Sequence, residues 1–238
     1  MKKDERNRGI LYRDVNEYLV LAKELYKDTI EINVGDREEI KIYLSQYDLL
    51  ENSLKEIKKS IKKLAKETIE VYDELIQIKG CGDDEIVSLL AEIGYVDNFS
   101  TARFLQGYFG LGLRGESSGK EVKPAKITKD GSKRARKMLY HMAMNLVSKN
   151  PDWRKVYCYY KTYDRPNPNQ KKEMLVAVAC KFLRVLYGMM KYNEGFDREK
   201  LLRSFDFRKC NKEKFITEYL GDKGKWKITE EELQELFG

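Results

Sequence analysis

The sequence predicts an all-α protein, with a long coiled-coil helix followed by a helical domain that contains a helix-hairpin-helix-like turn. Apolar residues recur at spacings of three and four through most of the 238 residues. No strand-turn-helix alternation, Walker loop or internal repeat interrupts this pattern. We divide the chain into an N-terminal helical lead-in (1–35), a coiled-coil helix (36–79), a helical domain (80–196) and a helical tail (197–238).

The composition excludes several classes of protein. Charged residues make up 36% of the chain, its net charge is +7, and no apolar run approaches the roughly 20 residues of a membrane span. The N-terminus MKKDERNRG lacks an apolar signal core, so we expect a cytoplasmic protein without membrane partners. One histidine, His141, and four scattered cysteines predict no metal site and reduced thiols; the cysteines are Cys81, Cys158, Cys180 and Cys210.

The first two elements are expected to be helices. Residues 14–32 carry apolar residues at helical spacing. After Gly35, the pair Asp36 and Glu39 has the spacing of a capping box and predicts the start of a second helix.

The second helix carries a heptad seam. Its positions alternate spacings of three and four: Ile40, Tyr43, Tyr47, Leu50, Leu54, Ile57, Ile61, Leu64, Thr68, Val71, Leu75 and Ile78. This period indicates a coiled coil, paired with another helix of the same chain or with a second copy in a homo-oligomer. Lysines between Lys55 and Lys66 flank the seam and are either solvated or in contact with nucleic acid.

Gly80 and Gly82 follow the seam and predict a helix-hairpin-helix-like turn. Glycine there lets backbone amides approach a phosphate at a helix N-terminus, although Gly-x-Gly is also an ordinary tight connection. Asp83 and Asp84 suit a helix start but would repel DNA.

The remaining helices follow from caps and apolar stripes. Ser100, Ser132 and Pro151 mark three helix starts, and residues 171–192 form the most apolar helix, which we expect at the centre of the domain. The tail should form two or three short helices, the last opened by Thr229 with Glu232.

Between two of these helices, residues 110–136 lack apolar periodicity and predict a long functional loop. The step Ser117-Ser118-Gly119 holds the best nucleophile candidates. From Ser118 to Tyr140 eight cations face two carboxylates, which accounts for +6 of the net charge of +7. The cations predict either contact with a phosphate backbone or a solvated face; they are Lys120, Lys123, Lys126, Lys129, Lys133, Arg134, Arg136 and Lys137.

Several blocks in a fixed order resemble one known family. They are Ile78–Gly82, Leu89–Gly94, Phe99, Gly110-Leu111, Ser118-Gly119, Ile127–Gly131, Arg136 with Leu139, and the helix of residues 177–187. Together they look like the C-terminal serine domain of the DEDD insertion-sequence transposases, the one-hundred-and-ten family, which includes pilin-gene invertases and bridge-RNA-guided recombinases. The seam resembles the coiled coil that precedes this domain.

The resemblance implies a DNA transposase or site-specific recombinase whose serine joins covalently to a DNA phosphate. Alignment with the family's Ser-Gly step selects Ser118, with Ser117 as the alternative. Lys129 and Arg136 match the motif and would stabilise the charge on the phosphoryl oxygens. His141 is either a base or a packed or surface histidine. DNA is the implied partner, with a guide RNA in the RNA-guided relatives.

One departure from the family bears on activity. Family members carry an acidic RuvC-like domain that holds divalent metal, and residues 1–35 show no alternating strands for it. We therefore expect no cofactor in this chain, and Mg²⁺ only together with that acidic domain. The chain would be a truncated gene, a separated subunit or a fragment. Besides the recombinase hypothesis, a catalytically silent DNA- or RNA-binding module and a coiled-coil scaffold remain as alternatives.

Overall fold

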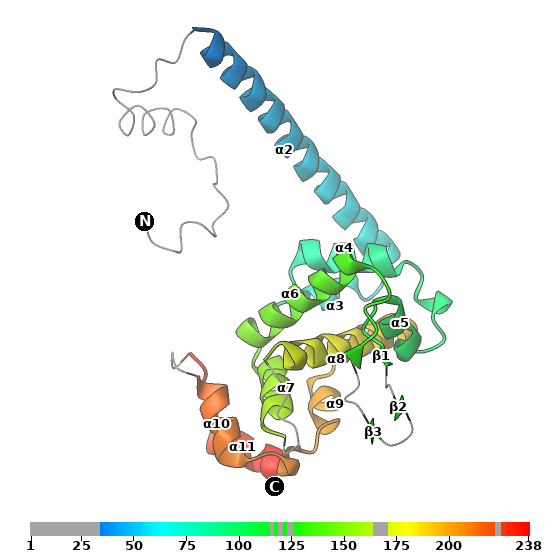
Figure 1. The fold of residues 1–238 in the computed structure, drawn as a ribbon, viewed down its shortest axis with the longest axis vertical. Coiled ribbons are helices and arrows are strands. Elements are labelled where there is room, and N and C mark those ends of the chain that lie inside the picture. Colours follow the sequence, from blue (N-terminus) through cyan, green and yellow to red (C-terminus); the bar gives the residue numbers. More distant parts are fainter. Residues whose placement is uncertain (1–33, 115–116, 119–120, 123–125, 164–170, 222–224) are drawn as a thin grey trace. The chain divides into compact units, whose positions relative to one another are not determined.

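The computed structural model describes residues 34–114, 117–118, 121–122, 126–163, 171–221 and 225–238. The expected helix over residues 14–32 lies outside them. The chain divides into two compact units, residues 1–56 and 57–238, which we describe separately. The described elements are helical apart from four strands of two residues each, so the all-α class is confirmed (Figure 1).

The long helix α2 runs from Val34 to Thr68. Its start differs from the expected capping box, because Asp36 already lies inside the helix. Within the first unit its seam residues are exposed, with 64% of Leu50 and 57% of Leu54 accessible to solvent. Leu50 and Leu54 thus form part of an exposed apolar face of α2.

The single helix expected to continue to residue 79 is interrupted after Thr68. A short helix α3 (Tyr72–Gln77) follows, and the last three seam positions lie in the core: Val71, Leu75 and Ile78 are at most 5% exposed. Burying these side chains against the domain requires the chain to turn, and the gain in apolar burial outweighs the continuity of the heptad pattern.

Helix α8 (Lys171–Tyr192) is the centre of the second unit, as its apolar sequence predicted. Val178, Phe182, Leu183 and Leu186 are at most 1% exposed. Around it pack α5 (Ala102–Tyr108), α6 (Lys133–Lys149) and α7 (Pro151–Thr162), while α4 (Asp83–Ile93) packs on α6 (Figure 1). The 3₁₀ turn η1 (Val96–Asn98) contacts α8.

Local capping signals place most helix starts correctly. The Ser132 hydroxyl accepts from the amide of Ala135 (3.2 Å), and Pro151 occupies the first turn of α7. Thr229 and Glu232 form the expected capping box of α11 (Glu230–Phe237). The start of α5 differs by one residue, because Thr101 rather than Ser100 caps it.

The tail packs on α7. It consists of α9 (Arg198–Arg203), η2 (Phe207–Lys209), α10 (Lys212–Leu220) and α11. Lys155 of α7 is 1% exposed, and its ammonium lies 2.7 Å from Glu232 of α11. Arg154 donates to the carbonyl oxygens of Tyr219 (2.6 Å) and Glu218 (2.7 Å). A buried cation needs such a partner, so this ion pair helps to hold α11 against the domain.

Candidate functional site

The central segment between α5 and α6 folds back on itself as an antiparallel arm. Strand β1 (Leu113–Arg114) pairs with β4 (Lys126–Ile127), in the register Leu113 opposite Ile127. Below this ladder the amide of Thr128 donates to Gly112 (2.8 Å) and that of Lys129 to Gly110 (3.1 Å). The loop expected to lack regular structure therefore contains a short ladder at its base. We call residues 110–131 the serine arm.

Both nucleophile candidates lie in one strand of this arm. Strand β2 (Ser117–Ser118) pairs with β3 (Glu121–Val122), so that the backbone of Ser118 is opposite Glu121. Gly119 and Lys120, which join the two strands, and Lys123 lie outside the described residues. The predicted nucleophile is therefore carried on a hairpin, farther from α5 than β1 is in the view of Figure 1.

Two glycines close the base of the arm. Gly131 has φ +139°, and a Cβ there would lie 2.3 Å from the carbonyl oxygen of Tyr108. Gly110 has φ +66°, and its Cβ would lie 2.3 Å from Nη1 of Arg136. Side chains at either position would push the two ends of the arm apart, because positive φ and this close approach both require glycine.

Arg136 is directed at the backbone of this base. Its Nη1 donates to the carbonyl oxygen of Phe109 (3.3 Å), immediately before Gly110. The side chain is half-buried. The structure thus gives Arg136 a role in fixing the arm, beside the phosphate contact that the sequence predicted for it.

Exposed cations gather where the arm enters α6. Lys129 is exposed and has φ +58°, a left-handed conformation unusual for a residue other than glycine. Lys133, Arg134 and Lys137 are exposed near the start of α6, which has no acidic residue in its first turn. Cations are unfavourable at the positive end of a helix dipole. This arrangement concentrates positive potential at one place and favours an anion there.

The turn at Gly80 and Gly82 connects α3 to α4 and packs tightly on α6. Gly80 has φ +104°, and a Cβ there would lie 2.8 Å from the Cα of Leu146 and 2.9 Å from the carbonyl oxygen of Asn145. Gly82 is the N-cap residue of α4. The contact with α6 explains Gly80 without a ligand, and the predicted phosphate contact of this turn stays a prediction.

The start of α4 already carries paired charges. The ammonium of Lys62 lies 2.8 Å from Asp83 and 2.7 Å from Asp84, and Lys58 lies 2.8 Å from Asp84. Hydrogen bonds from these lysines lower the pKa of Asp84 to about 2. Lys66 pairs with Asp73 (2.9 Å). Several lysines that flank the seam are therefore neutralised by carboxylates of the domain.

The other reactive residues show no sign of catalytic activation. All four cysteines are free thiols, and burial raises the pKa of Cys81 and Cys158 to about 12. His141 is exposed on α6. Among the described residues no group of three or more His, Cys, Asp or Glu is placed to hold a metal ion.

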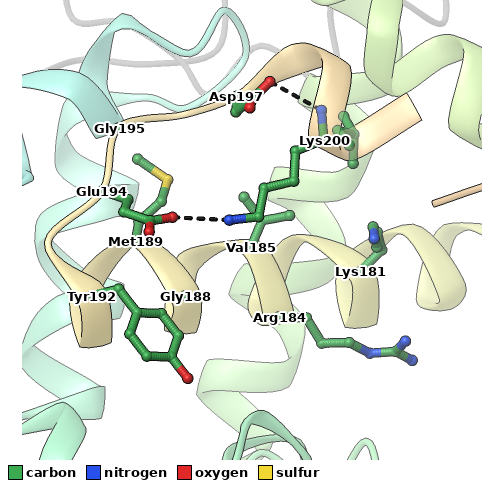
Figure 2. Close-up of a pocket in the computed structure, with 11 residues that line it drawn as sticks. Lys181, Arg184, Val185, Gly188, Met189, Tyr192, Glu194, Gly195, Asp197 and Lys200 are labelled. Atoms are coloured by element: carbon green, nitrogen blue, oxygen red, sulfur yellow. Dashed lines mark hydrogen bonds and ion pairs between the residues drawn. The ribbon is translucent and has the colours of Figure 1, made fainter. Parts of the chain in front are cut away.

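A pocket of about 240 Å³ lies between α8, the segment 193–197 and α9 (Figure 2). Lys200 crosses it to reach Glu194 (2.9 Å), and the carboxylate of Asp197 accepts from the backbone amide of Lys200 (3.0 Å). Lys181 donates to Ser204 (2.7 Å). The pocket lining includes none of the residues that the sequence predicted for the site.

Two aromatic residues of α5, Phe104 and Tyr108, are exposed, by 67% and 50%. Phe104 and Leu105 are both apolar, and adjacent helix residues can share one core, as Phe182 and Leu183 do in α8. The sequence alone therefore does not show which residues of α5 face the core.

No helix among the described residues is long and apolar enough to cross a membrane. The family model described as "Transposase IS116/IS110/IS902 family" matches residues 72–158. This range includes the Gly80–Gly82 turn, the serine arm, α6 and most of α7.

Two curated proteins are similar to the chain. They are the pilin gene-inverting proteins of Moraxella bovis and Moraxella lacunata, each 30% identical over 127 residues. The match covers 52% of this chain and 38% of each relative, so the chain spans well under half of their length. Residues 72–158 therefore match the transposase domain of the IS116/IS110/IS902 family, the family that the ordered sequence blocks resemble.

Proposed function

We propose that this chain acts in DNA recombination, with the serine arm and the start of α6 at the DNA and Ser118 as the nucleophile. The observation that carries the proposal is the group of exposed cations at the base of the arm whose hairpin bears two serines; they are Lys129, Lys133, Arg134 and Lys137. A phosphate backbone neutralises such a group, and phosphate contacts dominate DNA affinity.

The proposed chemistry is a transesterification. The Ser118 hydroxyl oxygen attacks the phosphorus and forms a phosphoserine ester, while the bond from phosphorus to a deoxyribose oxygen breaks and that oxygen takes the proton. The reverse attack by a deoxyribose hydroxyl of another strand rejoins the DNA. The phosphodiester energy is kept in the covalent intermediate, so no outside energy source is needed. Nearby cations stabilise charge on the phosphoryl oxygens.

The relatives support a recombination role by their names, which refer to inversion of a pilin gene. Since the match spans 38% of their length, their activity is extended to this chain as part of the proposal. We further propose that the exposed seam of α2 joins copies of the chain. Mg²⁺ would enter with an acidic domain, and the protein would work on cytoplasmic DNA.

The test uses the purified chain and a labelled DNA duplex that carries an insertion-sequence junction, with Mg²⁺ and without it. Denaturing electrophoresis reveals a protein-linked strand. We expect Ser118→Ala to abolish the linked band and to change DNA affinity less than about twofold, because phosphate contacts supply most of the binding. Ser148→Ala, an exposed serine of α6, is the matched control and should keep the band.

Other outcomes separate the alternatives. A band that vanishes in Ser117→Ala but persists in Ser118→Ala would move the nucleophile to Ser117. Salt-dependent binding without any linked strand, also when a guide RNA is added, would identify a silent DNA-holding module and contradict the serine chemistry for this chain. Absence of DNA binding would contradict the whole proposal.

A second test addresses the cations. The slope of log affinity against log salt concentration should fall by about 0.9 for each phosphate that the protein no longer neutralises. We expect the double variant Lys133→Gln, Lys137→Gln to make this negative slope shallower by nearly two. Lys55→Gln with Lys63→Gln is the control, because both lysines already pair with glutamates of α2. Equal slopes for the two double variants would contradict the assignment.

A further inference from the structure

Helix α5 presents two aromatic side chains to solvent. Phe104 and Tyr108 are four residues apart, so they lie on the same face, and they are 67% and 50% exposed. The opposite face is fixed on the core: Leu105 is fully buried, and Gln106 donates to the carbonyl oxygen of Cys180 in α8 (2.8 Å). The helix cannot roll to bury the two rings without breaking these interactions.

The aromatic face is held in a defined geometry. The ring of Tyr108 packs edge-on against Phe99 (5.4 Å between centroids) and against Phe109 (5.5 Å). Gly107 precedes Tyr108 in the helix, and apart from its chain neighbours a Cβ there would meet nothing within 4 Å. The helix surface at Gly107 is therefore open beside a restrained Tyr108, which suits a flat ligand.

This face adjoins the serine arm. A Cβ on Gly112, at the start of the arm, would lie 3.6 Å from the Cα of Gly107. At the other end of the arm, Gly131 approaches the carbonyl oxygen of Tyr108. A ligand on the exposed face of α5 would thus lie beside the base of the serine arm, which carries Ser117 and Ser118.

The surroundings are cationic. Arg103 of α5 is exposed, and α5 itself contains no acidic residue. In residues 126–137 Asp130 is the one carboxylate among six lysines and arginines. Exposed aromatic rings beside cations are the elements with which proteins bind single-stranded nucleic acid, because bases stack on the rings and phosphates contact the cations.

We propose that Phe104 and Tyr108 form a stacking platform for unpaired DNA bases next to the serine arm. The proposal deepens, and rests on, the proposed role in DNA recombination, in which cutting and exchanging strands leaves bases unpaired. Phe104 is a binding residue in this scheme. Tyr108 is a binding residue that also packs at the base of the arm, through its ring contact with Phe109 and the close approach of Gly131 to its carbonyl oxygen.

The experiment compares four proteins: the wild type, Phe104→Ala, Phe104→Leu and Phe104→Trp. The probes are a labelled single-stranded oligothymidylate, the matching duplex, and a single strand with 2-aminopurine as a stacking reporter. We expect Phe104→Ala and Phe104→Leu to weaken single-strand binding about tenfold and to lose quenching of 2-aminopurine. Phe104→Trp should retain both, and duplex affinity should change little in all variants.

Tyr192→Ala is the matched control. Tyr192 is 68% exposed, much as Phe104 is, but lies at the end of α8. It should leave affinity and quenching unchanged. Equal effects of Tyr192→Ala and Phe104→Ala would overturn the proposal, as would full affinity of Phe104→Leu, which keeps apolar contact without an aromatic ring.

The outcomes distinguish this proposal from the one on which it rests. If a serine-linked strand forms and Phe104→Ala leaves single-strand binding intact, the platform is wrong while the recombinase chemistry stands. If no linked strand forms but binding and quenching depend on Phe104, the platform stands without the chemistry. If Phe104→Ala separates copies of the chain and leaves DNA affinity unchanged, the face is a protein interface and the platform is overturned.

Discussion

Single glycines decide where two segments of backbone can meet in this protein. Gly80, Gly110 and Gly131 all have positive φ, and each would bring a Cβ to within 3 Å of backbone or side-chain atoms from a distant segment. Gly94 also has positive φ (+63°), but a Cβ there would meet nothing within 4 Å. A side chain at Gly94 would therefore incur only the cost of an unfavourable backbone conformation. A side chain at Gly80, Gly110 or Gly131 would also overlap with neighbouring atoms.

We therefore expect Gly80→Ala to destabilise the protein far more than Gly94→Ala. Gly94→Ala adds only the strain of its backbone conformation (φ +63°, ψ −129°), about 1–3 kcal/mol. Gly80→Ala adds overlap with the backbone of α6 and should cost more than about 3 kcal/mol. Urea unfolding followed by circular dichroism measures both. Similar losses for the two variants would show that the turn moves away from α6 without penalty.

At the level of elements, ion pairs hold the start of α4 to the C-terminal part of α2. Asp83 accepts from Tyr72 and pairs with Lys62, while Asp84 pairs with both Lys58 and Lys62. Hydrogen bonds from the lysines lower the pKa of both carboxyl groups, that of Asp84 to about 2. These groups are partly exposed, so each pair should contribute only about 0.2–1 kcal/mol.

Because the pKa values of Asp83 and Asp84 are lowered in the folded protein, the stabilisation by these ion pairs depends on pH. An aspartate in an unfolded chain titrates near pH 4, so the stabilisation is complete above that pH and is lost as pH falls towards 2. Between pH 6 and pH 2.5 the double variant Asp83→Asn, Asp84→Asn should lose less unfolding free energy than the wild type. Asp130→Asn, at an exposed position, should behave as the wild type does. Parallel pH profiles for all three proteins would refute this account.

At the scale of the whole molecule, the seam of α2 sets the expected assembly. Leu50 lies in the seam and is 64% exposed, while its neighbour Leu49 lies outside the seam and is 68% exposed. Both positions expose similar apolar area in the single chain, so their accessibility alone does not separate them. Only pairing of the seam with another helix would make them differ.

We expect Leu50→Lys to weaken self-association at least about tenfold, because a lysine in a coiled-coil core buries a charge without a partner. Leu49→Lys should have little effect. Sedimentation equilibrium over a range of protein concentrations measures the association constant. Dissociation by Leu49→Lys but not by Leu50→Lys would place the interface on another face of α2, and a wild-type monomer would exclude this interface.

Local sequence patterns were enough to predict the fold class, the bounds of α8, the caps of α6 and α11 and the first-turn proline of α7. The ordered motifs of the sequence also resemble the family whose model matches residues 72–158. These features depend on apolar periodicity, on side chains within one turn of a helix, or on motifs in a fixed order, and all of them are readable along the chain.

Tertiary contacts set where the seam breaks, explain why residue 80 is glycine, and fix which group Arg136 contacts. The structure also showed that the supposed loop pairs with itself at Leu113 and Ile127, and that α5 exposes Phe104. Each of these features depends on a contact between residues far apart in sequence, or on which face of a helix the core has already taken. Such contacts form because burial and hydrogen bonding across the fold outweigh the local preference of the segment, and no local pattern records that balance.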